Sequence, residues 1–146
     1  MEQTVRPLAA SDLHEVAQLE REARAGLVDT RGGAAHLAER AALGDWEPLL
    51  HSTDRMAWVS LIDDVLVGYL ELHVFGSIAE VMQVYVQPEA REVGFGDWML
   101  EAALSGAREH RCSVIEGTAL PGDRDTKNLY ERAGITARKI TLRKPL

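Results

Sequence analysis

Short runs of β-branched and other apolar residues recur along the first half of the chain and predict four β-strands. These strands are expected at Thr4–Leu8, Met56–Ile62, Val65–Val74 and Ala79–Val86. Two acidic residues, Asp63 and Asp64, separate the second strand from the third, and this spacing predicts a two-residue hairpin turn between antiparallel strands. Pro88 cannot donate a hydrogen bond to a neighbouring strand, so it ends the fourth.

The fourth predicted strand has a regular alternation, and successive side chains on a strand point to opposite faces of a sheet. Its even-numbered residues are expected to share one face, and these are Glu80, Met82, Val84 and Val86. The odd-numbered residues expected on the other face are Val81, Gln83 and Tyr85. The pattern therefore places the carboxylate of Glu80 on the same face as the two valines near the end of the strand.

Apolar residues at helical spacing predict four helices in the remaining segments, at about residues 11–26, 34–43, 96–110 and 123–133. Ser11 and Asp123 are expected to cap the first and the last of these helices, because their side chains can accept hydrogen bonds from free N–H groups. Gly134 is expected to end the last helix in the left-handed conformation. Two further strands are expected at Ser113–Leu120 and Ile135–Leu142.

The order of these elements predicts one α+β domain that spans residues 1–146. The helix at 96–110 connects two strands, and such a crossover makes the strands parallel and places the helix on one face of the sheet. We therefore expect a mixed, mostly antiparallel sheet with a central parallel β-α-β unit and helices on both faces.

Composition and charge narrow the classes of function. Hydrophobic residues make up 46% of the chain and charged residues 27%, which is typical of a globular domain. The formal net charge of −7 disfavours nucleic acid as a partner, because phosphate binding depends mainly on Lys and Arg. No apolar run approaches the roughly 20 residues of a membrane span, and the N-terminus lacks the pattern of a signal peptide. We expect no membrane partner and a cytoplasmic location.

Metal binding is not expected either. Cys112 is the only cysteine, so the chain has no pair of thiols for a metal site. The five histidines never fall four residues apart, the spacing that would direct two imidazoles from one helical face toward a metal.

Residues 87–100, QPEAREVGFGDWML, place two glycines at the expected start of the third helix. Glycine is unfavourable in a helix, but it leaves the main-chain N–H groups of a helix N-terminus uncovered. With the helix dipole, these donors favour a phosphate or diphosphate, and Arg91 can add its charge. The segment is not a P-loop, since Asp97 rather than a lysine follows Gly96, and Met99 stands where a dinucleotide fingerprint needs its third glycine.

The segment Arg91-Glu92-Val93-Gly94-Phe95-Gly96 resembles the R/Q-x-x-G-x-G/A signature of the GNAT N-acetyltransferase superfamily. Its surroundings are also similar to that family: "VYVQPEAR" leads into it, "CSVIEGTAL" follows the next helix, and "NLYERAGI" resembles the family's LYEKxGF. In element order the resemblance extends from about Thr4 to Thr141.

Three positions depart from the family's pattern. Asp123 stands where the family often has an asparagine near the cofactor, and Ile135 replaces the usual phenylalanine. The chain also ends soon after Leu142, so the usual terminal hairpin would be shortened to one strand or completed differently.

The resemblance implies that acetyl-CoA is the co-substrate. Main-chain N–H groups of the signature would hold its diphosphate, and the main chain of Val84 and Val86 would meet the pantetheine arm where their strand splays from its neighbour. The cofactor-binding residues implied in this way are Val84, Val86, Arg91, Glu92, Val93, Gly94, Phe95, Gly96, Asp97 and Asp123.

The resemblance also implies two catalytic residues. An amine must lose a proton before it attacks a thioester, and a carboxylate can accept that proton directly or through water. Glu80 matches the position of the family's catalytic glutamate, with Glu71 and His73 on the neighbouring strand as alternative bases. Tyr130 matches the tyrosine of the LYE motif, where its neutral hydroxyl would protonate the departing CoA thiolate.

We therefore expect an N-acetyltransferase that moves an acetyl group from acetyl-CoA to a primary amine by direct attack. A non-catalytic acyl-CoA-binding module of the same fold is one alternative, and a toxin that acetylates charged tRNA is another, disfavoured by the net charge. The sequence does not decide whether the acceptor is a small-molecule amine or a peptide amine, although the negative net charge of the chain would attract a cationic amine over long range. The shortened C-terminal segment, together with the dimers that the resembled family often forms, favours a homodimer.

Overall fold

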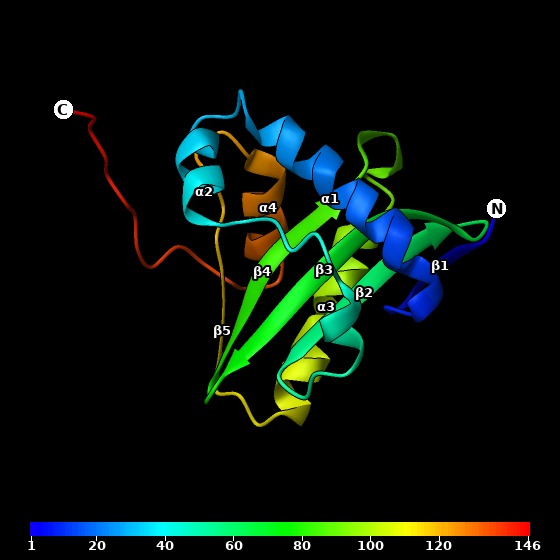
Figure 1. Ribbon diagram of the computed structural model, residues 1–146. Coiled ribbons are helices and arrows are strands. Elements are labelled where there is room, and N and C mark those ends of the chain that lie inside the picture. The colour runs from blue at the N-terminus through cyan, green and yellow to red at the C-terminus, as the bar shows by residue number, and fades with distance from the viewer.

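The computed structural model describes all 146 residues, which form a five-stranded sheet with helices on both faces (Figure 1). The strands are β1 (Gln3–Pro7), β2 (Arg55–Ile62), β3 (Val65–Phe75), β4 (Ile78–Val86) and β5 (Val114–Gly117). The α-helices are α1 (Leu13–Leu27), α2 (Gly33–Glu39), α3 (Phe95–Glu109) and α4 (Arg124–Arg132). The strands lie in chain order, and only β4 and β5 are parallel. The predicted fold class is confirmed, with the parallel β-α-β unit at one edge of the sheet.

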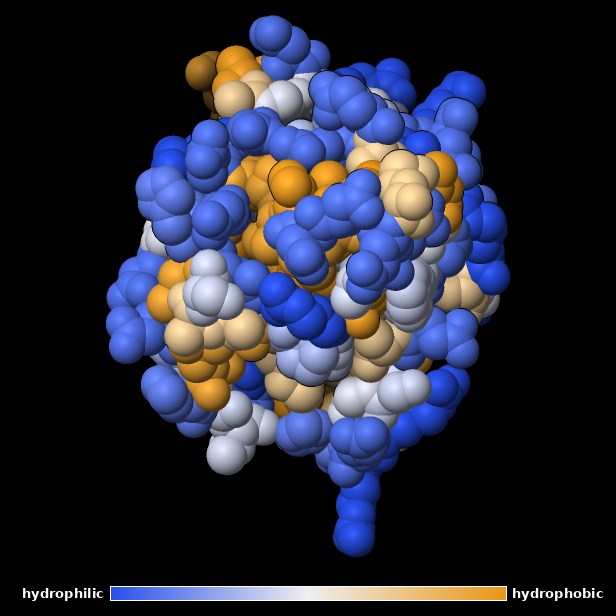
Figure 2. Space-filling view, turned by 90° about the vertical axis from the view of Figure 1, so that its right-hand side faces the viewer, coloured by the Kyte–Doolittle hydropathy of each residue, from blue (hydrophilic) through white to orange (hydrophobic).

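Two apolar cores fill the space between the sheet and its helices. Apolar side chains of α3 and α4, among them Met99 and Leu129, pack on one face of the sheet. Val16 and Leu19 of α1 pack on the other face together with Trp46, which stands edge-on to Tyr69 at 5.1 Å between ring centres. Polar residues dominate the face seen in Figure 2, with apolar patches between them. Apolar burial therefore holds both helical layers to the sheet.

The predicted hairpin between β2 and β3 is confirmed. Asp63 and Asp64 have φ values of 48° and 68°, the left-handed conformation that a two-residue turn of the right twist requires. By contrast, Ser11 does not cap α1. Asp12 acts instead within a preceding 3₁₀ turn, where its Oδ2 accepts a hydrogen bond from the N–H of Ala9 at 2.8 Å and its carboxylate pairs with Arg6.

A β-bulge in β4 overturns the predicted division of this strand into two faces. Glu71 pairs with Gln83 and the next residue of β3 pairs with Val81, so Met82 has no partner and the alternation shifts by one residue. Val81 then faces the α3–α4 core with Val84, while Gln83 faces the α1 side. Glu80 also turns to the α1–α2 side, where it pairs with Arg40 from the end of α2.

The neighbouring strands β4 and β5 pair only over their first residues. Ile78–Val81 aligns with Val114–Gly117, and the rest of β4 has no neighbour on that side. The predicted strand at 113–120 is therefore shortened to its first half. Beyond this point the two strands diverge, and the edge of β4 is left open.

The predicted last strand, Ile135–Leu142, does not form. Residues 135–146 have no regular secondary structure and run away from the sheet (Figure 1), held by an ion pair between Arg143 and Glu39. The alternating pattern fits a strand, but a strand also needs a ladder partner, and this segment does not reach the edge of β5. The side chain of Leu142 is 90% exposed.

Candidate active site

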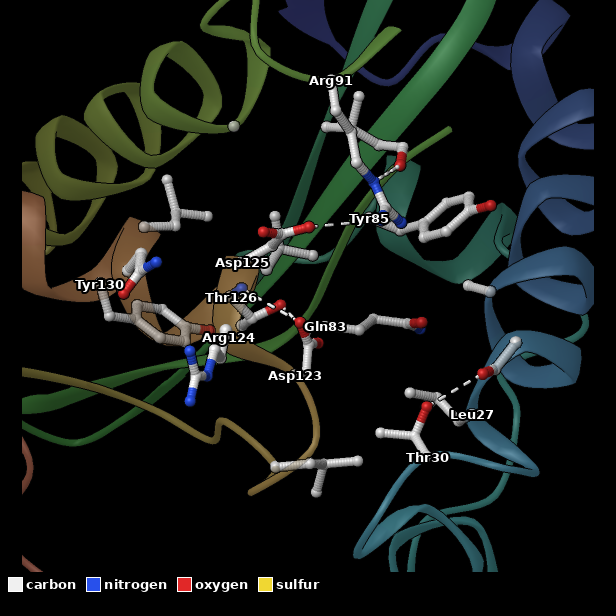
Figure 3. A pocket seen from close by; sticks show the side chains of 18 of the residues that line it. Leu27, Thr30, Gln83, Tyr85, Arg91, Asp123, Arg124, Asp125, Thr126 and Tyr130 are labelled. Carbon is white, nitrogen blue, oxygen red and sulfur yellow. Dashed lines mark hydrogen bonds and ion pairs between the residues drawn. The ribbon is translucent and has the colours of Figure 1, made fainter. Parts of the chain in front are cut away.

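A cleft of about 1390 Å³ opens where β4 leaves β5. One wall comes from the end of α1 and the segment that follows it, and the opposite wall comes from α4 and the start of α3. The open half of β4 forms the floor, with Gln83 and Tyr85 among the side chains drawn in Figure 3. The site residues predicted from sequence can therefore be located relative to one cavity.

The segment before α3 carries a row of free donors. Arg91 N–H donates to the carbonyl of Pro88, and Trp98 N–H donates to the carbonyl of Gly94. None of the six N–H groups between them, from Glu92 to Asp97, donates to another atom of the protein. With the positive end of α3 behind them, these unpaired donors are suited to an anion.

The two glycines of this segment have different roles. Gly94 has φ 91°, and a Cβ added there would meet nothing within 4 Å, so glycine is required for its backbone conformation. Gly96 lies inside α3, where a Cβ would come within 3.4 Å of Leu129 on α4. It allows the first turn of α3 to approach α4 closely. Phe95 is buried beneath the loop, and Val93 is half exposed.

Arg91 reaches over the end of β4. Its Nε donates to the carbonyl of Val86 at 2.8 Å, its guanidinium lies 5.7 Å from the ring centre of Tyr85, and its Nη1 is 3.5 Å from a carboxylate oxygen of Asp125 (Figure 3). The positive charge therefore sits in the cleft, and its only carboxylate partner is a weak, exposed one. Glu92 also lines the cleft.

The carboxylates of Asp97 and Asp123 have structural partners. Asp97 accepts two hydrogen bonds from Arg132, at 2.9 and 3.1 Å, and this pair joins α3 to α4. Asp123 caps α4 as predicted, because its Oδ1 accepts from the N–H of Thr126 at 3.1 Å and its Oδ2 from the hydroxyl of Thr126 at 2.6 Å. Both aspartates line the cleft.

The main chain of Val84 and Val86 faces the open side of β4. Gln87 N–H donates to the carbonyl of Val67 on β3 at 2.8 Å, so by alternation the polar groups of Val86 and Val84 point away from β3. The bond from Arg91 to the carbonyl of Val86 lies on that side. Their side chains pack on the α3–α4 core, so only the main chain is available to a ligand.

Tyr130 lies on the opposite wall, against the last residue of β5. A Cβ on Gly117 would come within 2.6 Å of the Tyr130 hydroxyl, so the absence of a side chain there is what lets the ring lie in place. The hydroxyl forms no hydrogen bond within the protein and is not among the fully buried oxygens, so it is open to the cleft that Tyr130 lines. Burial raises the pKa of Tyr130, an effect that Arg40 partly opposes and Asp123 and Glu80 reinforce. The phenol is therefore a neutral donor at pH 7.

The three candidate bases lie beside or behind the cleft rather than on its surface. Glu80 Oε1 accepts from Arg40 Nη2 at 2.8 Å, and Arg40 also donates to the carbonyl of Met82, the bulged residue that lines the cleft. Glu71 is 3% exposed, with its Oε2 2.5 Å from His73 Nε2. Gln83 donates to Glu71 and separates it from the cavity.

Sequence reasoning missed the α1–α2 wall. Arg24, Arg31 and His36 line the cleft there. Burial, with the nearby charges of Arg40 and Arg24, lowers the pKa of His36. No motif marks these residues. The sequence contains one signal that points to this region. Glu20 follows the apolar Val16 by four residues and therefore lies on the same face of α1, so a carboxylate stands on the buried face of this helix.

The acetyltransferase (GNAT) family model matches residues 14–135. The chain belongs to the GNAT family. The matched region contains the free N–H groups, both valines and Tyr130, so the resemblance carried by the signature is confirmed at the level of the family.

Solved structures with this GNAT fold cover the full chain. AAC(6')-Iy in complex with a CoA bisubstrate analogue has a TM-score of 0.70 and 18% identity, with 100% of each chain covered. A ribosomal-protein-alanine N-acetyltransferase of Brucella melitensis has a TM-score of 0.69 and 20% identity over 100% of this chain and 99% of its own. A transcriptional regulator of Bacillus halodurans C-125 reaches 0.71 and 19% over 99% and 100%. At these identities the likeness shows the fold alone.

A search of curated proteins gave no match to this GNAT chain. No group of three His, Cys, Asp or Glu side chains is arranged to hold a metal ion. None of the helices combines the length and the apolar composition that crossing a bilayer requires.

Proposed function

We propose that this chain is an N-acetyltransferase that moves an acetyl group from acetyl-CoA to a primary amine by direct attack. One observation carries the proposal: six consecutive unpaired N–H groups, three of them at residues that line the cleft, lie at the start of α3 on the same wall as the free hydroxyl of Tyr130. The first feature suits a diphosphate and the second suits a leaving thiolate, and acetyl-CoA contains both.

The cofactor end would bind through the main chain. N–H groups from Glu92 to Asp97 would take the diphosphate, and Arg91 would exchange its exposed partner Asp125 for phosphate oxygens. The outward-facing main chain of Val84 and Val86 would take the amides of the pantetheine arm. AAC(6')-Iy, which has this fold, was solved with a CoA-containing bisubstrate analogue, and this supports the assignment.

Acyl transfer then requires protons to move at the nitrogen, at the sulfur and at Tyr130. The amine nitrogen forms a bond to the thioester carbonyl carbon and loses its second proton to solvent, the carbon–sulfur bond breaks, and the thiolate takes a proton from Tyr130, which regains one from solvent. An alkylammonium with a pKa of about 10.4 must first lose a proton, which costs about 4–5 kcal/mol at pH 7. An N–H group of β4, fixed in advance, would stabilise the charge that develops on the carbonyl oxygen.

Glu80 is our candidate for the base that takes the amine proton. One of its carboxylate oxygens accepts from Arg40, and the other has no partner in the protein. Because Arg40 also bonds the carbonyl of Met82 on the cleft floor, a water molecule could connect Glu80 to the acceptor. Glu71 and His73 are alternatives that Gln83 separates from the cavity.

The alternative of a non-catalytic acyl-CoA-binding module is tested by two measurements on the same protein. Calorimetry with CoA reports binding, and free thiol released from acetyl-CoA in the presence of a primary-amine panel reports transfer. We expect both signals. Binding without thiol release would favour the module, and absence of CoA binding would refute both. A tRNA acceptor predicts salt-dependent binding of charged tRNA, which we do not expect at a net charge of −7.

Direct attack is tested by mass spectrometry of the protein after incubation with acetyl-CoA alone. We expect no acetylated protein, whereas a stable acetyl adduct would indicate a covalent intermediate.

We also propose a homodimer, supported by the unpaired outer edge of β5 and the exposed apolar residues Ile140 and Leu142. Sedimentation at several protein concentrations tests this assembly.

A further inference from the structure

The arginines that line the cleft differ in whether a carboxylate neutralises them. Arg132 pairs with Asp97, and Arg91 pairs with Asp125. Arg24 and Arg31, on the α1–α2 wall, pair with no carboxylate although both line the cavity. Arg124 also lacks a carboxylate partner, but it begins α4 on the other wall, between two aspartates in the sequence.

Both wall arginines are held in place by main-chain carbonyls that leave most of their donors free. Arg24 donates to the carbonyls of Arg40 at 2.8 Å and Leu37 at 3.4 Å. Arg31 donates to the carbonyl of Pro121 at 3.3 Å, in the segment between β5 and α4. A guanidinium has five N–H donors, so each retains at least three for a ligand.

The three carboxylates behind the lining of this wall, Glu20, Glu71 and Glu80, are buried or paired. Glu20 is 2% exposed, and its oxygens accept four hydrogen bonds, from Leu43 N–H, Gly44 N–H, Trp46 Nε1 and Gln83 Nε2. Glu71 is buried behind Gln83, and Glu80 is paired with Arg40. The wall therefore offers cationic donors to the cavity, and no carboxylate lines the cavity on this wall.

We propose that the acceptor amine carries an anionic group, a carboxylate or a phosphate, and that Arg24 and Arg31 bind this anion. The inference rests on the proposed acetyl transfer and adds the substrate class. This substrate class is the opposite of the one that the net charge favours. A net charge of −7 would attract cations over long range, but the contacts within the cleft decide which amine fits.

The segment that holds Arg31 also fixes it above the cavity. Gly122 N–H donates to the carbonyl of Arg31 at 3.1 Å, and a Cβ on Gly122 would lie 2.6 Å from the nitrogen of Arg31. The α1–α2 segment therefore touches the β5–α4 segment directly. An anion bound by Arg31 lies at this junction, so the amine of the same molecule can extend toward β4.

The test compares amines with and without the anion, with thiol release from acetyl-CoA as the readout and kcat/KM expressed per unprotonated amine, because removal of the anion also changes the pKa of the amine. Amino acids are compared with their methyl esters, and phosphoethanolamine with ethanolamine, which separates carboxylate from phosphate. We expect kcat/KM for one anionic class to exceed that of its neutral partner by at least about tenfold, mainly through KM, as charge-assisted hydrogen bonds would give. Equal values for both pairs, or a preference for polyamines, would overturn the proposal.

Arg24→Gln and Arg31→Gln should each reduce this ratio between anionic and neutral amine by about tenfold. Arg21→Gln is the matched control, because it removes the same charge from an exposed position on α1 outside the cleft. Since Arg24 also holds the end of α2, Arg24→Lys and the melting temperature of each variant separate lost anion binding from lost folding. A ratio that falls equally in Arg21→Gln would assign the effect to net charge and refute the site.

Binding of products distinguishes failure of this inference from failure of the proposed function. N-acetyl amino acids, N-acetyl phosphoethanolamine and their neutral counterparts are titrated into the CoA-saturated protein. Binding that needs the anion and Arg31, without thiol release from any amine, would support the anion site and refute catalysis. Thiol release with indifferent binding of acid and ester would support catalysis and refute the anion site.

Discussion

The two ends of the cleft are built by different means. The proposed cofactor end is a single segment of six consecutive residues, 92–97, whose main chain supplies the donors. The proposed acceptor end combines side chains from α1, α2, β3 and β4 with the segment after β5, and these are distant in the sequence. A main-chain site depends on conformation and tolerates changes of side chain, whereas a side-chain site is lost or altered by single substitutions. We expect the first to be common to proteins that use one cofactor and the second to vary with the acceptor.

The largest expected effect concerns Tyr130, which lies where the two ends meet. Tyr130→Phe should lower turnover at saturating acetyl-CoA by about 10²-fold, because it removes the proton donor to the thiolate. CoA affinity measured by calorimetry should be unchanged. Tyr85→Phe is the control, since it removes another hydroxyl from the same cleft. An unchanged rate in Tyr130→Phe would remove this residue from the mechanism.

Gly117→Ala tests the same hydroxyl without altering it. A Cβ here would come within 2.5 Å of the Tyr130 ring, so the ring must move while the backbone conformation suits alanine. We expect turnover to fall by about tenfold or more, with CoA affinity retained, as a displaced catalytic group would give. If the rate is unaffected and the melting temperature unchanged, the position of the ring is not important for catalysis.

Gly94→Ala tests whether the cofactor end depends on conformation. Alanine in the left-handed region costs about 1–2 kcal/mol, and relaxation of this strain would misalign the N–H groups. CoA affinity should fall about tenfold, the loss of roughly one charge-assisted hydrogen bond. Gly134→Ala, with φ 81° and open surroundings outside the cleft, should lower stability by a similar amount and leave CoA affinity unchanged. Equal affinities in the two variants would contradict a main-chain site.

The smallest effect should come from His36, at the acceptor end. Burial lowers its pKa below the ordinary value of about 6.5, and the charges of Arg40 and Arg24 lower it further. The unfolded chain then binds the proton more readily than the folded one. The contribution of this group to stability is complete above about pH 6.5 and is lost as the pH falls through the lower folded value.

Chemical denaturation of wild type and His36→Gln between pH 7 and pH 5 measures this contribution. The variant should lose less stability on acidification. His110→Gln should behave in the opposite way, because hydrogen bonds to the carbonyls of Gly106 and Thr53 raise the pKa of His110, which therefore stabilises the folded state at low pH. Parallel curves for wild type and His36→Gln would argue against the burial and the positive charges that lower the pKa of His36.

The same contrast explains what could be predicted from the sequence. The loop, its glycines, the cap at Asp123 and the place of Tyr130 follow from residues close together in the chain, and the structure contains them as expected. The bulge at Met82 could not be predicted, since it depends on how β3 aligns with β4, and it turned Glu80 to the other face. The wall with Arg24 and Arg31 depends on tertiary packing, which periodicity does not encode.

The missing last strand has a similar cause. Residues 135–142 have the alternation and the β-branched residues of a strand, but a strand forms only where a neighbour accepts its hydrogen bonds. The local sequence pattern shows that a segment can form a strand, but a strand forms only if the edge of the sheet is within reach to pair with it.

The amide of Gln83, donating to both Glu20 and Glu71 while accepting from Tyr69, has a consequence for how homologous proteins diverge. Replacing Gln83 alone removes one donor from each of two buried carboxylates, whereas exchanging several members together for nonpolar residues of matching size is tolerated far better. We therefore expect the residues at these four positions to change together among homologous proteins. Some homologues should keep all the polar side chains, and others should replace all of them with nonpolar ones.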